Sequence, residues 1–172
     1  FLAFDFSICR FSPLEPRFLH MIQVRDLKKN FGPKAAVDGI SFTVERGEVL
    51  GFLGPNGAGK STTMRMITGF IPPSEGSVKI GDHDMVDDPI LAKRLIGYLP
   101  ETAPSYADMT VGGFLNFTAE LRGLSGDAKK KAVGRAMEMC FLENVQHQSV
   151  ETLSKGYRHR TCFAQSIIHD PD

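Results

Sequence analysis

Gly54-Pro55-Asn56-Gly57-Ala58-Gly59-Lys60-Ser61-Thr62 is a glycine-rich run that fits the pattern G-x-x-x-x-G-K-[ST], the phosphate-binding P-loop or Walker A motif. A nucleotide triphosphate is a dense cluster of negative charge, and successive backbone N–H groups wrapped around it form an anion-binding nest. The glycines Gly54, Gly57 and Gly59 let the backbone come close and adopt positive φ angles. We therefore expect all nine residues to surround a bound nucleotide.

The end of the motif supplies the polar side chains that a nucleotide requires. Lys60 is expected to place its ammonium on the β- and γ-phosphates, and the Ser61 hydroxyl is expected to bind Mg²⁺. Residues 48–53 before the loop are mostly apolar and of strand length, and residues 62–70 after it suit a helix. Strand, glycine loop and helix are the order that the motif requires, so the sequence predicts a nucleotide-binding α/β domain.

Composition narrows the possible classes of protein. The chain has 172 residues, 42% of them hydrophobic, and its 20 basic and 20 acidic residues give no net charge. This balance gives no broad field for holding nucleic acid, so we expect no nucleic-acid partner. No apolar run reaches the ~20 residues of a membrane span, so a membrane role requires a partner. The cysteines Cys9, Cys140 and Cys162 are far apart, which favours a reducing cytosol.

The chain before the loop divides into two parts. Residues 1–20 hold five of the thirteen Phe and show no sustained periodicity, so we expect an extension outside the fold, with a short partner-binding arm as the alternative. Residues 22–27 and 40–44 both alternate between apolar and polar side chains, as half-buried strands do. They predict a small antiparallel sheet beside a parallel core.

A family resemblance appears in the residues that lead to the loop. The runs Leu27–Phe31, Ala36–Phe42 and Gly47-Glu48, followed by the P-loop, resemble the start of an ABC transporter ATPase subunit. In that family, an aromatic residue about two dozen positions before the loop stacks on the adenine ring, and Phe31 matches that position. Such stacking contributes ~1–3 kcal/mol per base in nucleic-acid systems.

Glu101 follows residues 95–100, which read as a buried strand. In ABC ATPases a glutamine usually occupies this position, where it reaches the Mg²⁺ or the attacking water. Glutamate occurs there in some exporter-type members, which Gly97-Tyr98-Leu99-Pro100-Glu101 resembles. A carboxylate is a hard oxygen ligand, so the resemblance implies metal contact by Glu101. Its added charge near the γ-phosphate leaves the glutamine's γ-phosphate role open, and an exposed loop glutamate is the alternative.

Residues 102–155 predict helices that interrupt the α/β pattern, as the helical subdomain of ABC ATPases does. We expect Thr110 to cap the first of these helices, along which a helical stripe is largely followed by Val111, Phe114, Leu115, Thr118 and Leu121. That subdomain contacts the membrane-spanning subunit in the family. Leu153-Ser154-Lys155-Gly156-Tyr157 then resembles the family signature Leu-Ser-Gly-Gly-Gln, with two positions changed. The Ser154 hydroxyl, the close backbone approach allowed by Gly156 and the helix that begins here form a second anion site. In the family, this site closes over the γ-phosphate held by the other subunit of a head-to-tail dimer.

The fold implied by this resemblance is an α/β P-loop NTPase. Residues 21–172 are expected to form a RecA-like core with an N-terminal antiparallel β layer and a helical subdomain over about residues 102–155. The resemblance also implies a catalytic Asp, Glu and switch His beyond Asp172, so no catalytic residue is assigned. We expect the domain to be C-terminally incomplete and residues 1–172 to be unable to turn over ATP.

The function implied is that of an exporter-type ATP-binding subunit. It would bind Mg-ATP, pair with a second ATPase subunit and drive a separate transmembrane permease from the cytoplasmic face of the membrane. The alternatives are a non-hydrolysing nucleotide-binding fragment and a soluble ABC protein outside transport. A GTPase or small-molecule kinase is a further alternative, although the Asn-Lys-x-Asp stretch that reads guanine is absent.

Overall fold

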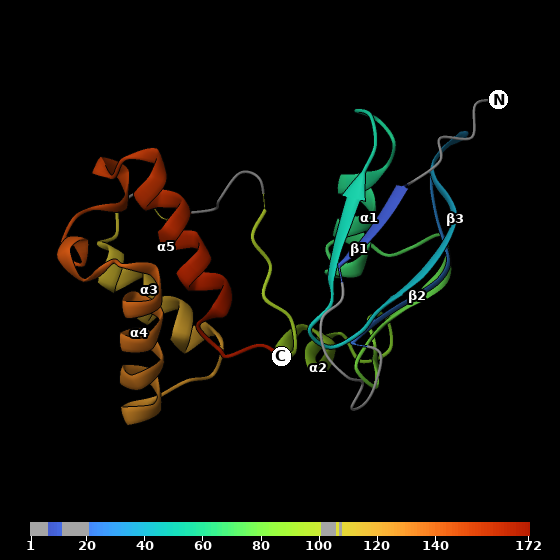
Figure 1. The fold of residues 1–172 in the computed structure, drawn as a ribbon. Helices are drawn as coiled ribbons and strands as arrows, with labels where there is room; N and C mark the ends of the chain where they lie inside the picture. The colour runs from blue at the N-terminus through green and yellow to red at the C-terminus, as the bar shows by residue number, and fades with distance from the viewer. Residues whose placement is uncertain (1–6, 12–20, 101–105, 107) are drawn as a thin grey trace. The chain divides into compact units, whose positions relative to one another are not determined.

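The computed structural model describes residues 7–11, 21–100, 106 and 108–172, and for residues 7–11 it describes only the backbone (Figure 1). The chain forms two compact units, Phe1–Ile96 and Gly97–Asp172. The predicted helical segment 102–155 lies within the second unit. Glu101 falls outside the described residues.

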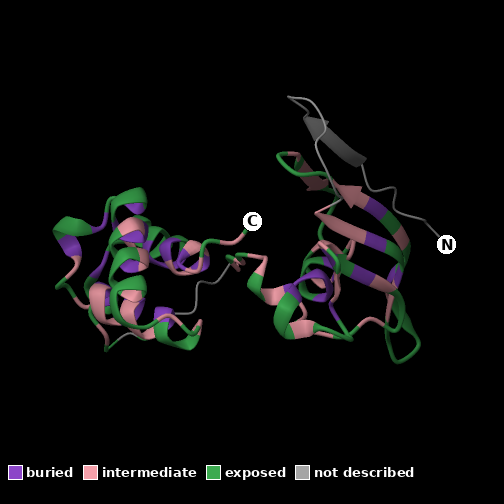
Figure 2. Ribbon diagram, turned by 90° about the horizontal axis from the view of Figure 1, so that it is seen from below, coloured by how far each residue is buried: buried purple, intermediate pink, exposed green. Residues whose placement is uncertain are grey.

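An antiparallel sheet of four strands forms the larger layer of the first unit. Its strands are β2 (Ile22–Phe31), β3 (Lys34–Val44), β5 (Glu75–Ile80) and β6 (His83–Asp84), in the order β3-β2-β5-β6. Val24 lies opposite Phe42 on one side and Val78 on the other, and all three side chains are buried. Figure 2 shows buried positions alternating with more exposed ones along these strands. The two strands predicted from alternation are present as β2 and β3, and both are longer than the predicted ranges 22–27 and 40–44.

The strand, loop and helix predicted around the P-loop are also present. β4 (Val49–Leu53) leads into the loop, and α1 (Lys60–Ile67) follows it. β4 pairs antiparallel with β1 (Ser7–Phe11), whose residues come from the segment that the sequence analysis set apart. This pairing uses backbone groups of β1 at the edge of β4. The boundary between an extension and a domain at residue 20 stays a prediction.

The strand predicted over residues 95–100 is not formed, so this prediction was wrong. The helix α2 (Pro89–Arg94) is present, but the chain after it is irregular up to Pro100. A strand forms only when its N–H and C=O groups find a neighbouring strand. In the part of the chain that the structure describes, no strand pairs with this run.

The described part of the second unit has three α-helices: α3 (Val111–Leu121), α4 (Gly126–Cys140) and α5 (Lys155–Ile167). Short 3-10 turns at Glu143–Val145 and Val150–Thr152 connect α4 to α5. Thr110 caps α3 as predicted, because its hydroxyl accepts a hydrogen bond from the Gly113 N–H at 3.0 Å. The helices enclose a core that includes Leu115, Leu142 and Ile168. Leu121, predicted on the buried stripe, is instead 70% exposed.

None of the helices that the structure describes has the length and apolar composition needed to cross a bilayer.

Candidate functional site

Two of the three P-loop glycines adopt the positive φ angles, in the left-handed region, that the sequence predicts. Gly57 and Gly59 have φ angles of 85° and 89°, in the region that favours glycine. Gly54 has a φ of 158°, which is close to extended backbone. The loop therefore takes its curvature from Gly57 and Gly59, immediately before the helix.

Lys60 closes the loop from the first position of α1. Its ammonium donates hydrogen bonds to the carbonyl oxygens of Gly54 at 2.6 Å and Pro55 at 2.7 Å. The ammonium is thus held against the backbone at the start of the loop, where it can interact with a bound phosphate group. The N-terminal end of α1 also carries a partial positive charge from the helix dipole. Backbone, side chain and dipole therefore all favour an anion at this point.

Ser61 fits the metal role that the sequence predicts for it. Its side chain is exposed on the first turn of α1, and its hydroxyl has no hydrogen-bond partner among the described residues. A hydroxyl oxygen is a ligand type that Mg²⁺ accepts. Ser61 is therefore free to bind a metal ion that accompanies a phosphate.

Gly59 joins the P-loop to the antiparallel sheet. A methyl group added at Gly59 would collide with the Ala36 carbonyl oxygen and lie 3.1 Å from Cγ2 of Val37, both on β3. Two backbones can approach this closely only when no Cβ atom separates them. Ala35, next to this contact, pairs with Asn30 on β2. The fold thus brings the end of the β2–β3 hairpin beside the phosphate-binding loop.

Phe31 lies at that hairpin end, where β2 pairs with Lys34 of β3. The residue is 53% exposed, whereas an ordinary core phenylalanine would be buried. The ammonium of Lys29 lies 5.4 Å from the centre of the Phe31 ring. An exposed ring at the end of the hairpin that contacts the P-loop has the chemistry to stack on a nucleotide base.

The signature-like residues begin α5 in the second unit. Ser154 is the N-cap residue, and its hydroxyl accepts a hydrogen bond from the Tyr157 N–H at 3.4 Å. Ser154 and Gly156 are both exposed, and a Cβ at Gly156 would meet nothing closer than the Ser154 hydroxyl, 4.0 Å away. The start of this helix is therefore open to an anion.

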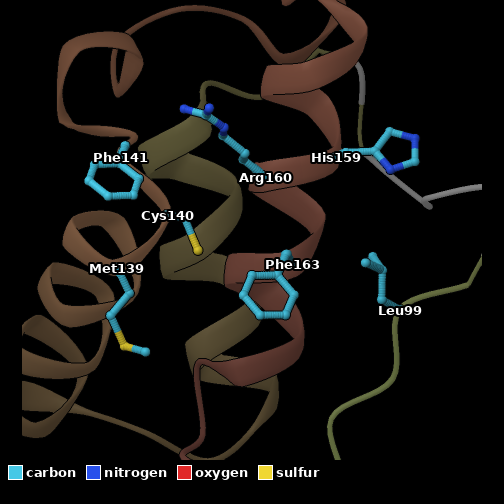
Figure 3. A pocket seen from close by; sticks show the side chains of 7 residues that line it. All are labelled: Leu99, Met139, Cys140, Phe141, His159, Arg160 and Phe163. Carbon is cyan, nitrogen blue, oxygen red and sulfur yellow. The ribbon is translucent and has the colours of Figure 1, made fainter.

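A shallow cavity of about 380 Å³ lies along α5 beyond these residues (Figure 3). The Arg160 guanidinium lies 5.4 Å from the Tyr157 ring and 5.9 Å from the Phe141 ring, so it links the first turns of α5 to the end of α4. Cys140 lines the same cavity, and burial raises the pKa of its thiol while the charge of Arg160 opposes that shift. This thiol is therefore a weak nucleophile at neutral pH.

The predicted residues fall into two sets. The loop residues 54–62 and Phe31 belong to the first unit, and Ser154 and Gly156 belong to the second. Sequence reasoning did not single out Ala36 or Lys29. Lys29 had a partial signal, because it precedes Phe31 by two and residues two apart share a face of a regular strand, although the register of β2 with β3 shifts between Lys29 and Asn30. Ala36 had none, because its contact with Gly59 depends on the fold.

Comparison with known proteins points to one family. A family model described as ABC transporter matches residues 37–172. The "Probable multidrug ABC transporter ATP-binding protein YbhF" of Escherichia coli is 35% identical over 152 residues, covering 88% of this chain and 26% of that protein. The "Linearmycin resistance ATP-binding protein LnrL" of Bacillus subtilis is 37% identical over 153 residues, covering 88% of this chain and 49% of that protein. The chain thus spans between about a quarter and a half of the length of these relatives.

A solved structure agrees on the fold. The cbiO1 protein of Clostridium perfringens, described as part of the ABC transporter complex cbiONQ, aligns with a TM-score of 0.74. The alignment covers 88% of this chain and 62% of that one, at 23% identity. This likeness supports the predicted α/β P-loop fold, in which an antiparallel sheet, a P-loop and a helical unit occur together.

Proposed function

Because this chain belongs to the ABC transporter family, among its ATP-binding subunits, we propose that it binds Mg-ATP and that the complete protein hydrolyses ATP to drive transport through a separate membrane subunit. The observation that carries this proposal is the P-loop itself. Gly57 and Gly59 curve the loop, and Lys60 lies across its mouth at the start of a helix. Such a loop suits the phosphates of a nucleotide.

The phosphates, the metal ion and the adenine each have a candidate partner in the first unit. Residues Gly54 to Thr62 enclose the phosphates, Lys60 neutralises their charge, and Ser61 binds the Mg²⁺ ion. Phe31 stacks on the adenine. Its exposed ring at the hairpin end and the approach of Gly59 to β3 support this assignment. Glu101 is proposed as a further metal ligand from its sequence position alone.

The second unit acts on the nucleotide of another subunit. In this proposal, Ser154 and Gly156 close over the γ-phosphate held by the P-loop of a second copy in a head-to-tail dimer. The exposed start of α5 supports this role, because its free backbone N–H groups and helix dipole attract an anion. The permease partner and the position at the cytoplasmic face of the membrane follow from family membership. The names of the relatives, which mention multidrug transport and resistance, favour an exporter.

A mixing experiment on the complete protein, assembled with its membrane subunit, tests this function. The variant Lys60→Ala damages the subunit's own phosphate loop, and Ser154→Ala removes the hydroxyl that caps α5 in the site offered to the other subunit. Each should hydrolyse ATP poorly by itself. In a head-to-tail dimer, a mixture of the two contains one composite site with both halves intact.

The mixture should therefore hydrolyse ATP faster than either variant alone. A mixture no faster than the two separate variants would contradict the shared site. Full hydrolysis by Lys60→Ala alone would contradict the proposed function as a whole.

A further inference from the structure

Lys29 makes two contacts that together fix the surroundings of the Phe31 ring. Its ammonium donates a hydrogen bond to the Pro72 carbonyl oxygen at 2.7 Å and lies 5.4 Å from the centre of the Phe31 ring. A cation within ~6 Å of a ring centre is attracted by the ring's electrons. Because Pro72 anchors the ammonium, the ring has a fixed partner on one side.

The backbone around Lys29 is held independently of its side chain. The Asn30 N–H donates to the Ser74 hydroxyl at 3.0 Å, and the Ser74 N–H donates to the Lys28 carbonyl at 2.8 Å. β2 also pairs with β3 at Lys29, Asn30 and Phe31. Removing the Lys29 ammonium therefore leaves the strand in place and changes the restraint on the ring.

We propose that Lys29 is a positioning residue for nucleotide binding, which holds the Phe31 ring so that its open face receives the adenine. A planar ring has two faces, and the ammonium covers one of them. Phe31 as a whole remains 53% exposed, so a surface is left for a base. This inference rests on the stacking role proposed for Phe31 and adds the residue that orients the ring.

This role predicts that losing the Lys29 charge weakens only the part of the ATP affinity that comes from the base. An exposed cation–π contact accounts for about a two- to fivefold change in affinity. Lys29→Met keeps the straight side chain and removes the charge, so it should weaken ATP binding by about that factor. The affinity for inorganic tripolyphosphate, which has phosphates and no base, should stay unchanged. Lys29→Arg keeps a cation and its donors and should bind ATP like the wild type.

A control separates ring positioning from the general loss of a positive charge. Lys79 is exposed on β5 of the same sheet, and its side chain has no partner among the described residues. Lys79→Met should leave ATP affinity unchanged. In a Phe31→Ala background, the substitution Lys29→Met should have no further effect, because the ring that it orients is absent.

Isothermal titration of the full protein and these variants with Mg-ATP and with tripolyphosphate decides the matter. A parallel loss of both affinities, an unchanged ATP affinity, or an undiminished effect without Phe31 would overturn the role of Lys29. If Phe31→Ala weakens ATP binding and Lys29→Met does not, only this inference fails. If Phe31→Ala itself has no effect, the proposed stacking fails as well.

Discussion

Replacing Gly59 by alanine should destabilise the first unit more than the same change at Gly57. Both glycines have nearly equal positive φ angles, 89° and 85°, so an alanine at either position has a similar backbone cost of ~1–2 kcal/mol. Of these two glycines, only Gly59 lies close to another backbone segment, because a methyl group added there would collide with the Ala36 carbonyl oxygen. At Gly57 the added methyl group would meet nothing within 4 Å.

The collision adds a second cost at Gly59. Forcing an extra methyl group into packed structure costs ~1–3 kcal/mol, so Gly59→Ala should lower the free energy of unfolding by ~2–5 kcal/mol in total. The difference between the two variants then isolates the contact between the loop and β3, at ~1–3 kcal/mol. Both variants introduce the same side chain, which makes each the control for the other.

Amide hydrogen exchange of β2 and β3 provides the assay, because it reports the free energy of opening of the first unit alone. We expect markedly faster exchange at these amides in Gly59→Ala than in Gly57→Ala. Equal exchange rates in the two variants would refute the contact between the P-loop and β3. The placement of Phe31 beside the phosphate site would then lose its main support.

Two further predictions concern the adenine platform and the buried thiols. Phe31→Ala should weaken ATP binding by ~1–3 kcal/mol and Phe31→Trp should retain it, as measured by calorimetry; an alanine variant that binds like the wild type would exclude stacking. Burial raises the pKa of the Cys140 and Cys162 thiols in the folded protein, so the unfolded chain ionises first as pH rises. Their contribution to stability is complete below the ordinary thiol pKa and is lost as pH rises through the raised one. The urea midpoint should thus stay constant as pH rises to the ordinary thiol pKa of about 8.5 and fall above it, and it should fall less in Cys140→Ala/Cys162→Ala; equal slopes would contradict this.

The sequence predicted the elements whose signals are local. The P-loop motif, the alternation over residues 22–27 and the Thr110 cap each depend on near neighbours in the chain, and all appear in the structure. Two expectations failed because they depend on distant partners. Residues 95–100 are apolar enough for a strand, but no described strand pairs with them. Leu121 follows the helical stripe, yet the neighbouring elements do not cover it.

The sequence was enough to predict which residues belong to the candidate site, but it could not predict how they contact one another in space. The motif assigned Lys60 and Ser61 before any geometry was known, because their roles follow from phosphate and metal chemistry. The contact between Gly59 and Ala36 joins β3 to the loop across a long stretch of chain, so no local pattern could reveal it. Lys29 is intermediate, since the sequence places it two residues before Phe31, and only the structure shows its contacts with that ring and with Pro72.

The central claim is that this P-loop binds ATP through Lys60, and calorimetric titration of the full protein with Mg-ATP tests it most directly. Charge-assisted hydrogen bonds contribute ~1.5–3 kcal/mol each, so Lys60→Ala should bind ATP at least about 10- to 100-fold more weakly than the wild type. Lys79→Ala, which removes an exposed lysine from β5, should bind like the wild type. Equal ATP affinity in the wild type and Lys60→Ala would contradict the assignment of the loop.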